Sequence, residues 1–322
     1  MNRFAHLKAS DILAAARRIA PLVTRTPLRR SDALSQAAGG DVFLKLETEQ
    51  VTGSFKARGA FNTLALMSPE DRARGVVASS AGNHGLGVAI AAKHFGAKAT
   101  IFVPHMAPEV KRRGIESLGA TVNAEAPDYD AAMDLAISHA KEHGATFIHP
   151  CLGDPLIAGQ GTVALEIIEE LPSLGTIIVP VGGAGLLAGT GALLRRIAPD
   201  IRILGAQSVH TAAMARSLAA GRVVPIPTEP TLADGLAGGI DEFALDVGRH
   251  ALDGIVTLEE DVIAEGIRFL RTEESVVSEG SGAVGVAALR SGALRVDRFP
   301  AAIVISGRNI DDARLDEVMH QR

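Results

Sequence analysis

The feature that most constrains this chain is an alternation of short apolar runs with longer alanine-rich segments of helical length. Of the longer segments, 107–119 has Pro108 in its first turn and Gly119 just past its end, as helices prefer. Apolar strands that alternate with helices indicate parallel sheets covered on both faces, so we expect an α/β fold. The predicted strands are 41–47, 75–79, 99–104, 145–150, 176–181, 201–207 and 301–306.

Composition narrows the class of protein. At about 150 residues per domain, 322 residues predict roughly two domains, and a 47% hydrophobic content excludes a disordered chain. A net charge of −5, no basic block and 3% aromatic residues argue against nucleic-acid binding. The single cysteine, Cys151, excludes an internal disulfide and suits a reducing compartment, so we predict a cytoplasmic protein.

Neither the N-terminus nor the longest uncharged stretch predicts a membrane segment. The first residues carry charges and lack the apolar core of a signal peptide. Residues 171–194 carry no charge and are long enough to span a bilayer. However, Pro180 and several glycines favour a buried strand, a glycine loop and a helix start, so we expect no membrane contact.

Four segments carry candidate chemistry, and three of them directly follow predicted strands. Ligands of open α/β sheets bind in loops beyond the carboxyl ends of the strands. Each segment also has an ordinary structural interpretation, such as a surface lysine, a tight turn, close strand–helix packing or a helix cap. The segments are Thr52–Ala60 around Lys56, Ser79–Gly85, Val181–Leu186 and Ser306–Asn309.

The residue types of these segments fit distinct tasks. A partly desolvated lysine amine can form a Schiff base. Small residues at a helix start expose backbone N–H groups to a carboxylate, and the glycine loop exposes them to a phosphate. No Gly-Lys-Ser/Thr follows that loop, so a nucleoside triphosphate is not indicated. A hydroxyl at the end of the last strand, Ser306, can donate to a ring nitrogen.

In this order and spacing, the segments resemble the fold-type II pyridoxal-phosphate enzymes, and most closely the serine/threonine dehydratase (ammonia-lyase) family. The resemblance covers nearly the whole chain and includes 45–47 (Lys-Leu-Glu) and 233–235 (Ala-Asp-Gly). It implies two open, twisted, mostly parallel αβα domains of the tryptophan synthase β type, with the cofactor in the cleft between them. Residues 1–49 and 149–322 would form the large cofactor-binding domain and 50–148 the small one. A homodimer without a C-terminal regulatory domain is expected.

The resemblance also implies roles for individual residues. Lys56 would hold pyridoxal 5′-phosphate as a Schiff base and take the Cα proton of the substrate. Phe55 would pack on the pyridine ring, and Ser306 would meet its nitrogen. Other cofactor contacts would come from Asn83, at the ring's 3′-oxygen, and from Gly182, Gly183, Ala184, Gly185 and Leu186, around the phosphate. The substrate would lie against Ser80, Ala81, Gly82, Asn83, His84 and Glu279.

Five positions depart from the family's pattern. Ala184 replaces a glycine, which we expect to be tolerated at negative φ. Arg308 replaces another glycine and would be strained at positive φ. Gln207 and Ala213 stand where many relatives have a Glu and an Asp that bind a divalent cation, so we predict no metal there. Ala81 stands where serine racemases of this fold carry a serine acid/base, so we predict elimination without efficient racemisation.

The predicted reaction is β-elimination from L-threonine or L-serine, which yields a 2-keto acid and ammonia. The same chemistry on 3-phenylserine, 3-hydroxyaspartate or hydroxyectoine stays open, as does a β-replacement synthase of the same fold. A nicotinamide-dependent oxidoreductase rests only on the G-x-G-x-x-G match at 280–285. The charged segment before that match and the serine that ends the next strand favour helix packing and a pocket wall instead.

Overall fold

The chain is described by a computed structural model over residues 6–107, 109–227 and 229–320. The strands are β1 (Leu28–Ser31), β2 (Val42–Leu46), β3 (Val76–Ser79), β4 (Ala99–Pro104), β5 (Thr121–Ala126), β6 (Thr146–Phe147), β7 (Thr176–Pro180), β8 (Arg202–Ser208), β9 (Gly254–Leu258) and β10 (Ala301–Ile305). The α-helices are α1 (Ala9–Ile19), α2 (Asp32–Ala38), α3 (Lys56–Leu66), α4 (Pro69–Arg74), α5 (Asn83–Phe95), α6 (Glu109–Ser117), α7 (Tyr129–His143), α8 (Asp154–Glu170), α9 (Gly185–Ile197), α10 (Ala213–Ala220), α11 (Glu242–Ala251), α12 (Glu260–Thr272), α13 (Gly280–Arg290) and α14 (Asp312–His320). Short 3₁₀ turns are η1 (Glu47–Glu49), η2 (Val209–Thr211) and η3 (Asp234–Leu236).

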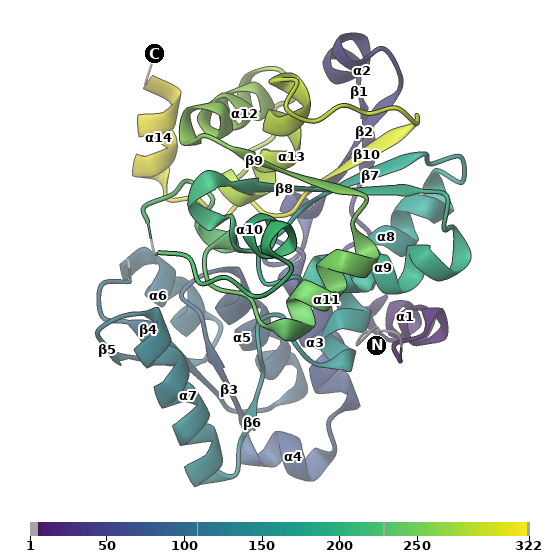
Figure 1. Cartoon of the computed structure of the whole chain (residues 1–322). Coiled ribbons are helices and arrows are strands. Elements are labelled where there is room, and N and C mark those ends of the chain that lie inside the picture. Colours follow the sequence, from purple (N-terminus) through teal and green to yellow (C-terminus); the bar gives the residue numbers. More distant parts are fainter. Residues whose placement is uncertain (1–5, 108, 228, 321–322) are drawn as a thin grey trace.

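The strands form two separate sheets, which confirms the predicted α/β class (Figure 1). One sheet has the order β1-β2-β10-β7-β8-β9, and every pair in it is parallel except β1 with β2. The other has the order β5-β4-β3-β6 and is parallel throughout. In Figure 1 the larger sheet occupies the upper half of the molecule and the smaller sheet the lower half.

Alternate residues of β7, β8 and β10 in the larger sheet face two different cores. Ile177 and Val179 of β7 pack in a cluster with α8 and α9, whereas Ile178 packs in a cluster with α12 and α13. Successive side chains of a strand point to opposite faces, so a strand covered on both sides is apolar throughout. The continuous apolar runs in the sequence therefore reflect helices on both faces.

The smaller sheet follows the same rule. Val76 and Ala78 of β3 pack with α3 and α5, whereas Val77 packs with α7. All of its strands come from residues 76–147, while the strands of the larger sheet come from 28–46 and 176–305. The chain therefore leaves the larger sheet after β2, builds the smaller one, and returns through α8.

The strands that the sequence pattern missed or overextended are edge strands. β1, β5 and β9 were not predicted, and each lies at the edge of its sheet. β6, also at an edge, has two residues instead of the predicted six. Edge strands are commonly short or polar, because one side is open to solvent. β1 is Leu-Arg-Arg-Ser, which carries no apolar run.

The uncharged stretch at 171–194 folds as predicted into a buried strand, a glycine loop and the start of a helix, namely β7 and α9. No helix among the described residues is long and apolar enough to cross a membrane. The predicted helix at 107–119 corresponds to α6, but Pro108 lies outside the described residues.

Candidate active site

Lys56 begins α3 beside the loop that follows β10. The backbone N–H of Phe55 donates to the Ser306 carbonyl at 3.1 Å, and the Arg308 N–H donates to the Gly53 carbonyl at 2.9 Å. A β-bridge also joins Ser54 and Gly307. The first and last of the four candidate segments, more than 240 residues apart in sequence, thus run side by side.

The Lys56 amine is half-buried and held in place. Its Nζ donates to the Pro150 carbonyl at 2.9 Å and lies 5.3 Å from the centroid of the Phe55 ring. The ordinary interpretation of Lys56 as a free surface side chain is therefore wrong. An amine with this degree of shielding is suited to act as a nucleophile.

The second segment makes a tight connection from β3 to α5. The Gly82 N–H donates to Ser80 Oγ at 3.1 Å, and α5 begins at Asn83. A Cβ on Gly85 would lie 2.2 Å from the Ser80 carbonyl, so only glycine allows this turn to close. The backbone N–H groups of the first turn of a helix lack intrahelical acceptors and favour a bound anion.

The Asn83 side chain faces both Glu279 and Asn309. Its Nδ2 donates to Glu279 Oε1 at 2.7 Å, and its Oδ1 accepts from Asn309 Nδ2 at 2.5 Å. Asn309 also donates to the Thr52 carbonyl at 2.9 Å. An amide NH₂ has two hydrogens, so Asn83 retains one donor beyond Glu279.

Glu279 is buried beside Asn83, at the start of α13. Burial, together with the negative charge of Asp234, raises the pKa of Glu279 to about 7. The hydrogen bond from Asn83 and the charge of Lys111 oppose this shift. Glu279 is therefore a carboxyl group that can hold or release a proton near neutral pH, as candidate catalytic acids do.

The His84 side chain is anchored to the segment that follows β6. Its side chain is buried, and Nε2 donates to the Ile148 carbonyl at 2.8 Å. Burial and the nearby charge of Lys56 lower the pKa of His84 to about 3, so the ring is neutral. Its Nδ1 has no hydrogen-bond partner among the described residues, and its backbone N–H lies in the first turn of α5, so the substrate contact of His84 stays a prediction.

The glycine loop after β7 lies against the segment that ends in Cys151. An added Cβ would lie 3.0 Å from Leu236 Cα at Gly182, 2.6 Å from Cys151 Sγ at Gly183, and 3.2 Å from Cys151 Cα at Gly185. The loop leads into α9, whose first N–H groups are open to an acceptor. Leu186, in that first turn, is buried.

Two expectations about departures from glycine have different outcomes. Ala184 has φ +67° and ψ 3°, so the condition on which this alanine was expected to be tolerated, a negative φ, is not met. The backbone of Ala184 thus adopts the left-handed conformation, in which the Cβ of an L-residue is strained. Arg308 is not among the described non-glycine residues with positive φ, so it carries no such strain.

Gln207 links the glycine loop to the turn after β8. Its Nε2 donates to the Val181 carbonyl at 2.9 Å and to the Thr211 carbonyl at 2.8 Å, and its Oε1 accepts from the Ala215 N–H at 3.1 Å. The side chain is fully buried, and its amide donors occupy both carbonyls. The sequence pattern shows Gln207 only as a missing metal ligand and gives no signal for these contacts.

The G-x-G-x-x-G match at 280–285 begins α13 directly after a loop, without a preceding strand. A Cβ on Gly285 would lie 2.6 Å from Ile303 of β10, and one on Gly282 would lie 2.8 Å from the Gly307 carbonyl. These glycines therefore serve close helix-to-sheet packing, and one of them borders the site.

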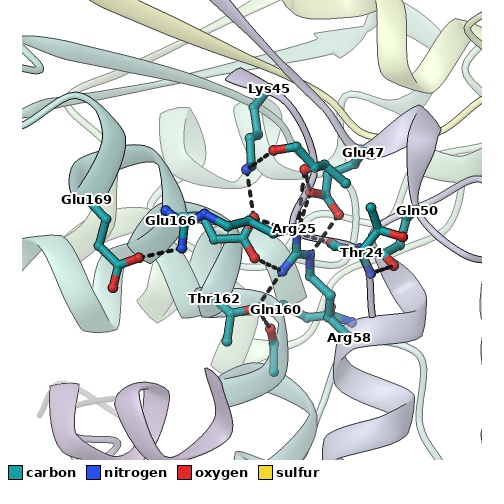
Figure 2. A network of polar contacts seen from close by, with 12 residues as sticks. Thr24, Arg25, Lys45, Glu47, Gln50, Arg58, Gln160, Thr162, Glu166 and Glu169 are labelled. Carbon is teal, nitrogen blue, oxygen red and sulfur yellow. Dashed lines mark hydrogen bonds and ion pairs between the residues drawn. The ribbon is translucent and has the colours of Figure 1, made fainter. Parts of the chain in front are cut away.

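A buried network of charges surrounds Arg58, which follows Lys56 by two residues in α3 (Figure 2). Arg58 forms paired hydrogen bonds with Glu47 at 2.8 Å and also binds Glu166 at 2.6 Å. Lys45 donates to Glu166 at 2.6 Å. We call these four residues the charged cluster. It ties the first turn of α3 to β2, η1 and α8.

The polar groups around Lys56 that lack hydrogen-bond partners are suited to bind pyridoxal phosphate. Thr52 Oγ1, Ser54 Oγ and Ser281 Oγ are buried and have no hydrogen-bond partner within the described parts of the chain. A buried polar atom without a partner costs about 1–3 kcal/mol, which a bound polar molecule can offset. Together with the Lys56 amine, the spare Asn83 donor and the open loop at 182–186, they match an aldehyde with a phosphate group.

Comparison with known proteins decides the family. The family model described as "Pyridoxal-phosphate dependent enzyme" matches residues 19–307. The chain belongs to this family. Its cofactor is therefore pyridoxal phosphate, as the sequence predicted.

Individual members of the pyridoxal-phosphate family match over nearly the whole chain. An L-threonine ammonia-lyase of Thermotoga maritima is 43% identical over 97% of this chain and 78% of the relative. The structure of maize serine racemase has a TM-score of 0.92 and 34% identity, and 97% of each chain is covered. The processed form of threonine deaminase isoform 2 from Solanum lycopersicum has a TM-score of 0.90 and 31% identity, over 96% and 90%. These matches confirm the predicted fold type.

Proposed function

We propose that this chain is a lyase that removes ammonia from L-threonine or L-serine by β-elimination. The substrate loses its Cα proton and its β-hydroxyl group, and hydrolysis then gives a 2-keto acid and ammonia. The observation that carries the proposal is the position of the Lys56 amine. Its Nζ lies 2.9 Å from the Pro150 carbonyl, close to the other three candidate segments. Threonine ammonia-lyases among the relatives support the substrate class.

Bound pyridoxal phosphate would supply the electron sink of the reaction. Lys56 Nζ would hold the cofactor and then accept the Cα proton. The spare Asn83 N–H would face the oxygen of the ring, and Ser306 would face its nitrogen. Backbone N–H groups of 182–186 would bind the phosphate, and those of 80–84 the substrate carboxylate.

The side chain of Ala81 favours elimination over racemisation. Racemisation needs a second acid/base on the face of the substrate opposite Lys56. Ala81, at the turn between β3 and α5, has only a methyl group and cannot transfer a proton. The similarity to maize serine racemase makes racemisation the competing function, and a chiral product assay separates the two.

We also propose that the enzyme is a cytoplasmic homodimer with a large domain of residues 1–49 and 149–322 and a small domain of 50–148. The single cysteine and the family resemblance support the first part. The second is supported by the two sheets, because the strands of each fall within one of these sets.

The proposal is tested by release of 2-keto acid from L-threonine, L-serine and the other 3-hydroxy amino acids named above. We expect Lys56→Ala to lower release by at least about 10³-fold, because it removes both the cofactor attachment and the base. Lys93→Ala, at an exposed lysine of α5, is the matched control and should retain full activity. Borohydride reduction followed by peptide mass analysis should locate the cofactor on Lys56.

Three results would contradict the proposal. One is keto acid release that survives in Lys56→Ala. Another is conversion of L-serine mainly to D-serine, which would make the enzyme a racemase. The third is a yellow, Lys56-linked protein that releases no keto acid from any tested amino acid, which would move the function to β-replacement or to hydroxyectoine.

A further inference from the structure

Asn309 lies where three parts of the site meet. Its side-chain Nδ2 donates to the Thr52 carbonyl at 2.9 Å and to Asn83 Oδ1 at 2.5 Å. Its backbone N–H is hydrogen-bonded to Glu279 and thereby lowers the pKa of that carboxyl. A Cβ on Gly53 would lie 2.8 Å from Asn309 Oδ1, so the side chain packs directly on the loop that leads to Lys56.

The Thr52 carbonyl fixes the direction of this chain of hydrogen bonds. A carbonyl can only accept, so Asn309 must turn its NH₂ group toward it. The same NH₂ group reaches Asn83, which must therefore offer its oxygen. The NH₂ group of Asn83 then points the other way, toward Glu279, and keeps one hydrogen for another acceptor.

We infer that Asn309 is a positioning residue that fixes the orientation of the Asn83 amide, so that Asn83 presents an N–H rather than a carbonyl to the cofactor. The inference rests on the proposed function only for the location of the cofactor. Asn309 itself would not contact the reacting atoms. Its role is to prevent a flip of Asn83 by binding the oxygen of that amide.

Two substitutions separate orientation from space filling. Asn309→Asp keeps the shape but places an acceptor against Thr52 O and Asn83 Oδ1, which forces Asn83 to flip. Asn309→Ala leaves a gap but allows Asn83 either orientation. An orientation role therefore makes Asp the worse change, whereas a space-filling role makes Ala the worse change.

The measurement is the affinity of the purified apoprotein for pyridoxal phosphate, followed by the visible absorbance of the holoenzyme against pH. We expect Asn309→Asp to weaken cofactor affinity about 10-fold, the scale of one lost hydrogen bond. The pH midpoint of its visible band should also move upward, because negative charge on the ring oxygen loses its donor. Asn309→Ala should show smaller changes in both quantities.

Asn123→Asp, on β5 of the other sheet, is the matched control and should behave as the wild type. A larger effect of Ala than of Asp, or no effect of either, would overturn the inference. If Asn309→Asp does not fold, the Ala variant decides: unchanged affinity and an unchanged visible band refute the role. A wild type that takes up cofactor but releases no keto acid refutes only the proposed substrate, because these readouts need no turnover.

Discussion

Two polar clusters, one buried and one part-buried, contact the two ends of the Lys56 segment, and they are built in opposite ways. The charged cluster of Lys45, Glu47, Arg58 and Glu166 combines two positive and two negative groups. The second cluster, Asn83, Glu279 and Asn309, which we call the site cluster, contains one ionisable group with no cation bonded to it in the described chain.

The pKa shifts of Arg58, Glu166 and Glu279 differ in the same way as the two clusters. Burial alone would lower the pKa of Arg58, but Glu47 and Glu166 outweigh it and raise that pKa above its ordinary value. Burial alone would likewise raise the pKa of Glu166, and Arg58 together with Lys45 lowers it instead. At Glu279 burial prevails and raises the pKa to about 7. Pairing keeps the first cluster charged, whereas its absence leaves the second able to change protonation.

The difference teaches which polar groups serve the fold and which serve the ligand. The side chains of the charged cluster form hydrogen bonds with one another and hold the first turn of α3 in place. Near the site cluster, Ser54 and Ser281 keep buried hydroxyls without partners among the described residues. Unsatisfied groups cost stability in the free protein, and a cofactor can recover that cost on binding.

The largest expected effect comes from breaking the charged cluster. Arg58→Met leaves Glu47 and Glu166 without their main partner and should lower the free energy of unfolding by about 3–5 kcal/mol. Arg58→Lys keeps the charge but loses the forked hydrogen bonds, so its cost should be intermediate. Urea denaturation of the apoprotein measures both changes.

The matched control is Arg25→Met, which removes an arginine bound to Glu169 and Glu170 at the surface. That pair is half-exposed and should contribute less than about 1 kcal/mol. Equal costs for Arg25→Met and Arg58→Met would show that burial of the charged cluster does not matter.

A smaller effect is expected from Glu279, and it depends on pH. The pKa of Glu279 in the fold is about 7, against an ordinary value of 4.5, so the fold favours the protonated form. Its contribution to stability is fully present below pH 4.5 and is lost as the pH rises through about 7. The loss is on the order of 3 kcal/mol. Glu279→Gln, which resembles the protonated form, should flatten this dependence.

Urea denaturation of the apoprotein between pH 5 and pH 8 provides the test. Glu265→Gln, at a carboxylate whose side chain is 68% exposed, is the control and should leave the wild-type slope unchanged. A Glu279→Gln variant with the same slope as the wild type would mean that Glu279 does not titrate in this range.

The smallest effect concerns backbone strain beside the site. Ala184→Gly relieves the left-handed conformation at φ +67° but loses a buried methyl group and adds freedom to the unfolded chain. The net result should be a stabilisation of about 0.5 kcal/mol. Ala188→Gly, one turn further along α9, should instead destabilise by about 1 kcal/mol. Melting temperatures that fall equally in both variants would exclude strain at Ala184.

The sequence by itself determined the α/β class, the cofactor family and the central strands. Strands buried on both faces are mostly apolar, so β3, β4, β7, β8 and β10 are visible without a structure. The glycines before α9 and at Gly85 also follow from local chemistry, because a turn or a close backbone approach excludes a side chain. Motif order then identified Lys56 as the residue that would hold the cofactor.

Only the tertiary structure decided how the polar groups are paired. The links from Asn309 to Asn83 and from Arg58 to Glu166 join residues 226 and 108 positions apart, and local pattern carries no signal for such contacts. The φ of Ala184 and the open edges of β1, β5 and β9 are likewise set by packing. Whether a hydrogen bond forms depends on differences of a few tenths of an ångström in the donor–acceptor distance, and only the complete fold sets these distances.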